Sequence, residues 1–261
     1  MFKNIIDIIF DGKNEETLSP LEIICNSEKI TEEILSTYLE YYIDNPFNNY
    51  NMHNHEIDEI MLHPNSDDWT PLHYLCNNEK ITEKILEILL RYYNKETINI
   101  DKDEGRTPLH LLCDNNKISF ELLDLMLKNN ANINHCGNKI FCYDGTPFHN
   151  LCANQNLTLN ILKLAMQYVK DINVECYSGN SVPLEYLIIN NDDNELISFM
   201  LENGAKICRR NMTGLIEKRY KLMLKKKISE KVMSSTNLIS NLNNLVADYI
   251  CEDYICEDLL F

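Results

Sequence analysis

The stretch TPLHYLCNN at residues 70–78 returns as TPLHLLCDN at 107–115 and as TPFHNLCAN at 146–154. Successive starts of this motif lie 51, 37, 39, 36 and 31 residues apart. Repeats of this length are supersecondary units that bury their apolar faces on one another, so a stack is expected instead of one closed core. Five starts and a weaker sixth align: Ser19-Pro20-Leu21, Thr70-Pro71-Leu72, Thr107-Pro108-Leu109, Thr146-Pro147-Phe148, Val182-Pro183-Leu184 and Thr213-Gly214-Leu215.

Each unit predicts two helices. Thr or Ser before Pro is a favoured N-cap, and Pro at the first helical position has no amide hydrogen to leave unpaired. A second hydroxyl cap precedes an apolar pattern of helical spacing, such as Ile85-Leu86 followed by Leu89-Leu90. A Gly- and Asp-rich turn such as DKDEGR at 101–106 then leads to the next unit. The second caps are Thr31, Thr82, Ser119 and Thr158.

These motifs resemble the ankyrin repeat family. The resemblance rests on the Thr-Pro-Leu-His start, on NANIN at 130–134, on ENGAKI at 202–207, and on a period near the family's about 33 residues. It implies a mainly α-helical solenoid of helix-turn-helix units with short β-hairpin-like turns. Residues 1–18 are expected to form an N-terminal capping helix and 19–208 five repeats, with an insertion at about 44–66. Residues 209–261 are expected to form a C-terminal helical cap or appendage.

A histidine stands three residues before a cysteine in three units, which raises the question of metal binding. Equivalent residues of packed helices lie roughly 8–10 Å apart, whereas zinc–sulfur bonds are about 2.3 Å long, so they do not converge on one ion. The resemblance gives the histidine a hydrogen-bonding role at the turn, with Glu22 and Glu185 in its place in the first and fifth units. The cysteines are expected to pack as small hydrophobes. The pairs are His73/Cys76, His110/Cys113 and His149/Cys152.

One further set of potential metal ligands lies around the turn NHCGNKIFCYDG at 134–145. Three thiols and an imidazole on neighbouring turns could hold zinc or sense redox state, although their spacing matches no strong signature. Ordinary reduced turn residues are the other interpretation, because ten cysteines without a signal peptide suggest a reducing compartment. The residues of this alternative are His135, Cys136, Cys142 and Cys176.

The resemblance also implies where a partner would bind, namely in the concave groove and at the turn tips. Trp69, the only tryptophan, precedes Thr70 at a tip, where it could anchor a partner or pack under the insertion. Arg106, Tyr143 and Tyr177 hold comparable tip positions. Groove positions on or just after the first helices are Tyr74, Asn77, Asn78, Asp114, Asn115, Asn150 and Asn154.

No catalytic motif is present: the chain has no phosphate-binding glycine loop, nucleophile elbow or metalloprotease helix. We therefore expect a non-enzymatic module without a cofactor or small-molecule ligand. The net charge of −16 disfavours nucleic acid as a partner of the acidic body and favours a protein with a basic contact surface. No stretch is apolar enough to span a membrane, and a cytoplasmic location, in its own or a host cell, is expected.

The tail differs in charge from the rest of the chain. Residues 206–231 hold ten Lys or Arg and two Glu, and the sequence DYICE occurs twice near the end. Some viral ankyrin proteins end in a truncated F-box-like segment that recruits a cullin ubiquitin ligase, and NLISNLNNLVADYI is similar to it in apolar spacing. It lacks that family's Leu-Pro start. A substrate adaptor of viral or intracellular-parasite type is therefore the alternative to a plain binding module.

Overall fold

The computed structural model describes residues 18–42, 69–101, 105–136, 145–176, 181–191 and 193–207. The chain divides into two units, residues 1–210 and 211–261, and the described residues all belong to the first. They form five helix pairs and one short 3-10 helix, η1, at Thr97–Asn99. The pairs are α2 (Pro20–Asn26) with α3 (Glu32–Tyr42), α5 (Pro71–Asn77) with α6 (Glu83–Leu90), α7 (Pro108–Asp114) with α8 (Phe120–Lys128), α9 (Pro147–Ala153) with α10 (Leu159–Met166), and α11 (Pro183–Asn190) with α12 (Asn194–Glu202).

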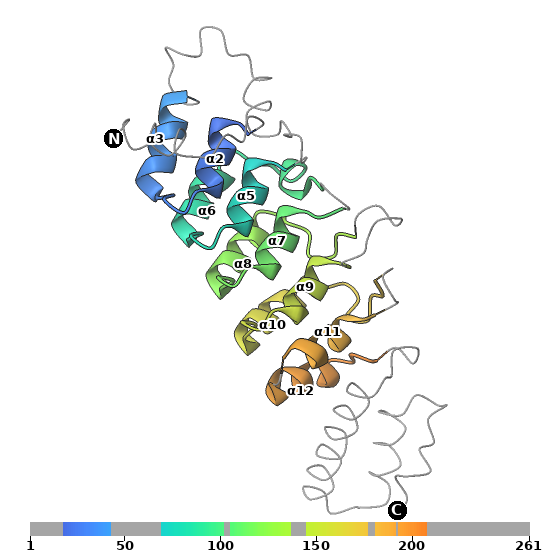
Figure 1. The fold of residues 1–261 in the computed structure, drawn as a ribbon. Coiled ribbons are helices and arrows are strands. Elements are labelled where there is room, and N and C mark those ends of the chain that lie inside the picture. Colours follow the sequence, from blue (N-terminus) through green and yellow to red (C-terminus); the bar gives the residue numbers. More distant parts are fainter. Residues whose placement is uncertain are drawn as a thin grey trace, which may run out of the picture. The chain divides into compact units, whose positions relative to one another are not determined.

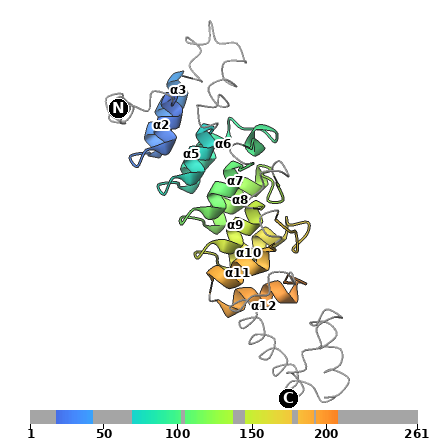
Figure 2. The same ribbon diagram turned by 45° about the vertical axis from the view of Figure 1, so that its right-hand side comes forward.

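The helices form two rows, visible in Figures 1 and 2. In the first-helix row, α2, α5, α7, α9 and α11 each pack on the next. In the second-helix row, α3, α6, α8, α10 and α12 do the same. Each layer thus buries its apolar side on its neighbours, which confirms the predicted mainly helical solenoid.

The first helix of every pair begins at the predicted proline. A hydroxyl residue precedes the proline in four of the five pairs, and its side chain makes one of two kinds of hydrogen bond. Ser19 caps α2 as expected, because its Oγ accepts from the Glu22 amide at 3.3 Å. Thr70, Thr107 and Thr146 instead turn the hydroxyl toward Nδ1 of the motif histidine, at 2.8, 2.9 and 3.0 Å. A nearby imidazole acceptor thus replaces the helix amide as the partner of the threonine hydroxyl.

The second helices begin at the predicted caps. Thr31, Thr82, Ser119 and Thr158 each accept from the amide three residues ahead, at 3.2 to 3.4 Å. Asp193 supplies the fifth cap through a 2.8 Å bond from the Glu195 amide.

Two ladders of asparagine amides connect successive layers. In the loop after α7, Asn115 Nδ2 donates to the carbonyls of Cys76 and Asn78 in the preceding layer, at 2.9 and 3.1 Å. Asn78 and Asn154 repeat the arrangement. Behind the second helices, Asn134 donates to the Tyr168 carbonyl and accepts from the Lys170 amide, both at 2.8 Å. Asn99 and Asn173 do the same one layer before and after.

Several predicted features lie outside the described residues: the N-terminal capping helix, the insertion at about 44–66, the sixth motif copy and the segment 209–261. The described residues contain no β-strand. One turn tip is nevertheless closed as a hairpin would be, because the Cys176 amide donates to the Ser181 carbonyl at 2.9 Å. Among the described helices, none is long and apolar enough to cross a membrane.

Candidate functional site

The three motif histidines are fully occupied by structural hydrogen bonds. Nδ1 of His110 accepts from the Thr107 amide at 2.9 Å, so the ring proton sits on Nε2, which donates to the Gly145 carbonyl of the next layer at 3.4 Å. His73 and His149 make the same bonds, to the carbonyls of Arg106 and Ser181. Each imidazole therefore joins its own turn to the following layer, and neither nitrogen is left for a metal.

Burial keeps two of these histidines neutral. It lowers the pKa of His110 to about 3, helped by the neighbouring His135, and lowers the pKa of His149 to about 4.

Where glutamate replaces the histidine, a carboxylate oxygen takes over the acceptor role. Ser19 N–H donates to Glu22 Oε2 at 2.6 Å, and Val182 N–H donates to Glu185 Oε2 at 3.3 Å.

The motif cysteines are packing residues. Cys25, Cys76, Cys113 and Cys152 are all 0% exposed. Burial raises the pKa of each thiol well above its usual range, which disfavours the thiolate, the nucleophilic and metal-binding form. The histidine–cysteine repeat is thus structural and is not a metal array.

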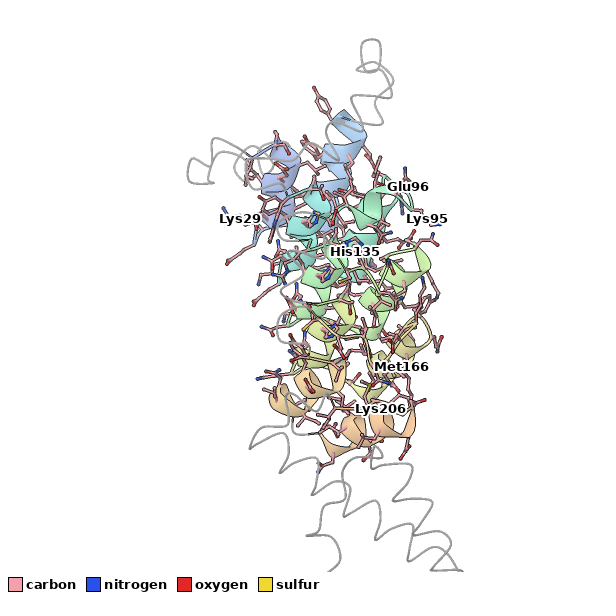
Figure 3. The ribbon with its side chains drawn as sticks, turned by 90° about the vertical axis from the view of Figure 1, so that its right-hand side faces the viewer. Lys29, Lys95, Glu96, His135, Met166 and Lys206 are labelled. Carbon is pink, nitrogen blue, oxygen red and sulfur yellow. The ribbon has the colours of Figure 1, made fainter. Side chains whose placement is uncertain are left out.

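The alternative metal or redox set is only partly described. The His135 ring meets the His110 ring edge-on at 6.0 Å between centroids, and its Nε2 lies 3.4 Å from Asp101 Oδ2. Cys136 is exposed, Cys176 is buried, and Cys142 lies outside the described residues. Within the described part of the chain, no three His, Cys, Asp or Glu side chains are placed to hold a metal ion. Figure 3 shows His135 on the side facing the viewer, between Lys29 at one edge and Lys95 and Glu96 at the other.

Trp69 is half-buried, and it packs on the helix that follows. Its ring lies 5.2 Å from the Tyr74 ring and 6.1 Å from the His73 ring, centroid to centroid. Tyr74 itself is only 7% exposed. The two predicted contact residues, Trp69 and Tyr74, are therefore brought together, and of the two the tryptophan is the more exposed.

Three of the predicted groove residues are turned into the stack. Asn78, Asn115 and Asn154 are 8%, 7% and 7% exposed, because their amides form the first ladder. Short polar side chains next to a turn suggested solvent-facing positions, but the carbonyls of the preceding layer lie within reach and cannot be seen from local sequence. Asn77 and Asp114 remain exposed.

The structure does bring three predicted residues together. Arg106 pairs with Asp114 Oδ2, and Asn150 Nδ2 donates to the same oxygen at 2.8 Å. They come from a turn tip, the end of α7 and the adjacent helix α9. The remaining tip residues, Tyr143 and Tyr177, lie outside the described part of the chain.

Charge is divided unevenly between the two rows. The second helices carry nine carboxylates and three lysines. On the first helices, all of them described, Asp114 is the one exposed side chain with a formal charge, since Glu22 and Glu185 are 1% exposed. Among the described helices, the excess of acidic residues therefore lies mainly in the second-helix row.

Sequence reasoning missed Ile189, which is 51% exposed near the end of α11. The sequence does contain a pattern that indicates this exposure. Ile189 occupies the seventh position of its helix, as the exposed Asn77 and Asp114 do in theirs. Counting from the repeated proline would have placed all of these side chains on one line of the first-helix row.

Residues 39–136 match the family model for ankyrin repeats, which holds three copies. No curated protein matches the chain. The bonds between Thr146 and His149, and from His149 to the Ser181 carbonyl, copy those of the earlier layers, so the same architecture continues past the matched segment.

Proposed function

Because the chain contains ankyrin repeats, which are in general protein–protein interaction modules, we propose that it is a non-enzymatic protein-binding module. It binds, sequesters or scaffolds a partner protein through the exposed side of the first-helix row and the adjoining turn tips. The partner presents a basic contact surface.

One contrast within the repeats carries this proposal. The second position of each first helix is always a large apolar residue that is at most 1% exposed: Leu21, Leu72, Leu109, Phe148 and Leu184. The seventh position, which is exposed or half-exposed, changes chemistry in almost every layer: Asn26, Asn77, Asp114, Ala153 and Ile189. A constant interior that displays a varied surface is what recognition of an asymmetric partner requires.

The interior supports the same conclusion. In the described layers, the buried polar side chains with repeated positions are engaged in capping or in bonds between layers. These bonds rigidify the scaffold, so little ordering entropy remains to be lost when a partner binds.

Affinity capture with the full-length chain tests the proposal. Three baits are used in the same cell extract: wild type, an Asn77→Ala/Ile189→Ala variant on the first-helix row, and an Asn160→Ala/Gln167→Ala control on α10 and its C-cap. We expect a partner that the control retains and the first variant loses. A partner held equally by all three baits would place the contact elsewhere.

The adaptor alternative depends on residues 209–261, which lie outside the described part of the chain. It remains a prediction, since no structural observation favours it. Cullin components among the captured proteins would support it.

A further inference from the structure

Two residues of the cluster formed by Arg106, Asp114 and Asn150 depart from the repeat pattern, and each departure carries a cost. Asp114 is the last residue of α7, where a negative charge opposes the helix dipole by about 0.3–1 kcal/mol. The equivalent residues of the other first helices, Asn26, Asn77, Ala153 and Ile189, are all uncharged.

Asn150 is a second departure from the repeat pattern. It fills the fourth position of α9, where the other first helices carry Ile23, Tyr74, Leu111 and Tyr186. It is 6% exposed, and its Oδ1 is buried without a hydrogen-bond partner in the described structure. Leaving a buried acceptor unpaired costs about 1–3 kcal/mol, and the residues at this position in the other layers have no side-chain amide oxygen to leave unpaired.

The other layers stack without either departure, and local rules are typically broken at functional sites. Both departures add a hydrogen-bond acceptor to one cluster: the Asp114 carboxylate, whose side chain is 41% exposed, and the oxygen of the Asn150 amide whose Nδ2 is bonded to that carboxylate. The complementary ligand is a cation with several donors. A guanidinium offers five N–H groups in one plane, whereas an ammonium is a point charge.

We propose that the Arg106–Asp114–Asn150 cluster is the docking site for an arginine side chain of the partner protein, an inference that rests on the proposed function. The partner's guanidinium binds the Asp114 carboxylate and donates to Asn150 Oδ1. In the unbound chain Arg106 occupies the position of the partner's guanidinium. It pairs with Asp114 Oδ2, which also accepts a hydrogen bond from Asn150 Nδ2. Binding displaces Arg106, whose side chain is 28% exposed and therefore has solvent to move into.

The charge distribution favours such a ligand. Asp114 is the one exposed charge on the first helices, so a cation that reaches this row has a single point of attachment there. The net charge of −16 draws basic partners toward the molecule from a distance, and the local carboxylate fixes the register.

NMR titration of the full-length chain tests the site directly. The probe is Nα-acetyl-arginine methylamide, and its citrulline counterpart, which has the same shape without the charge, is the matched control. The reporter is the side-chain amide signal of Asn150, assigned by its loss in Asn150→Leu. We expect the arginine compound to shift this signal in a saturable way and the citrulline compound to leave it unchanged.

Three variants separate the roles of the cluster. Asp114→Asn should weaken the response at least about tenfold, because the charge-assisted bonds are lost. Arg106→Gln should strengthen it severalfold, because the internal competitor is gone. Asn150→Leu, followed through backbone signals of α9, should weaken binding while raising the melting temperature, which a misfolded variant would not do.

Equal responses to arginine and citrulline, or an Asp114→Asn variant that binds as wild type does, would refute the inference. If wild type then still captures a partner that Asn77→Ala/Ile189→Ala loses, the proposed function stands without this site. If capture also fails, both are refuted.

Discussion

Acidification should destabilise this chain through two buried histidines, His110 and His149. His110 and His149 accept a hydrogen bond at Nδ1 and stay neutral in the folded state, since burial lowers the pKa of His110 to about 3 and that of His149 to about 4. In the unfolded chain a histidine has a pKa of about 6.5. The unfolded state therefore binds more protons below this value, and stability falls as the pH falls from about 6.5 toward 4.

The size of the effect follows from the same values. Between pH 7 and pH 5 each histidine removes about 2 kcal/mol from the free energy of unfolding, so the pair removes about 4 kcal/mol. This is a large share of the about 5–15 kcal/mol that holds a typical domain together. Protonation would also place a donor on Nδ1 opposite the donating Thr107 and Thr146 amides.

Urea unfolding followed by far-UV circular dichroism and by Trp69 fluorescence measures this loss at a series of pH values. The matched control is His110→Gln/His149→Gln, whose amide oxygen can accept the threonine amide but does not titrate. Both proteins keep every carboxylate and the other histidines, so those groups contribute to both measurements. We expect wild type to lose about 4 kcal/mol more than the control between pH 7 and pH 5. Equal losses in the two proteins would refute the assigned histidine roles.

Three further predictions concern the stack. Asn115→Ala removes two hydrogen bonds to the preceding layer and should lower the free energy of unfolding in urea by about 2–3 kcal/mol. Asn77→Ala, at an exposed position, should lower it by under about 0.5 kcal/mol. Similar losses in the two variants would show that the asparagine ladder does not stabilise the stack. Iodoacetamide followed by mass spectrometry should label the exposed Cys136 and spare Cys25, Cys76, Cys113 and Cys152 in the native chain, and rapid labelling of these four would contradict their burial. Gly145→Ala should cost about 3 kcal/mol or more, because φ is +83° and the new Cβ would lie 2.7 Å from the His149 ring. Gly204→Ala, where φ is +87° and the surrounding space is open, should lower the free energy of unfolding by only about 1–2 kcal/mol. If Gly145→Ala lowers it no more than Gly204→Ala does, the close contact between Gly145 and the His149 ring is refuted.

Much of the scaffold was readable from local sequence, because its signals act over three or four residues. Proline at the first helical position, the hydroxyl caps of the second helices and the apolar spacing each depend on neighbours along the chain. The histidine's bond to its own turn spans three residues and is of the same kind. The repeat period then implied stacking, because a single unit cannot bury its apolar side alone.

The candidate site depends on contacts that local sequence does not contain. Asn78 and Asn150 are both short polar residues on or next to a first helix, yet Asn78 bonds to carbonyls 51 and 53 residues away and Asn150 to a carboxylate 36 residues away. Whether an amide faces solvent or the preceding layer is decided by the spacing and register of the layers.

The sequence by itself thus determined which segments become helices, where they begin and that they stack. Only the tertiary structure decided which polar side chains form hydrogen bonds between the layers and which stay exposed on the surface, where a partner could contact them. The physical reason is that hydrogen bonds within a turn are set by chain connectivity, whereas those between layers require two distant segments to be held a few ångströms apart.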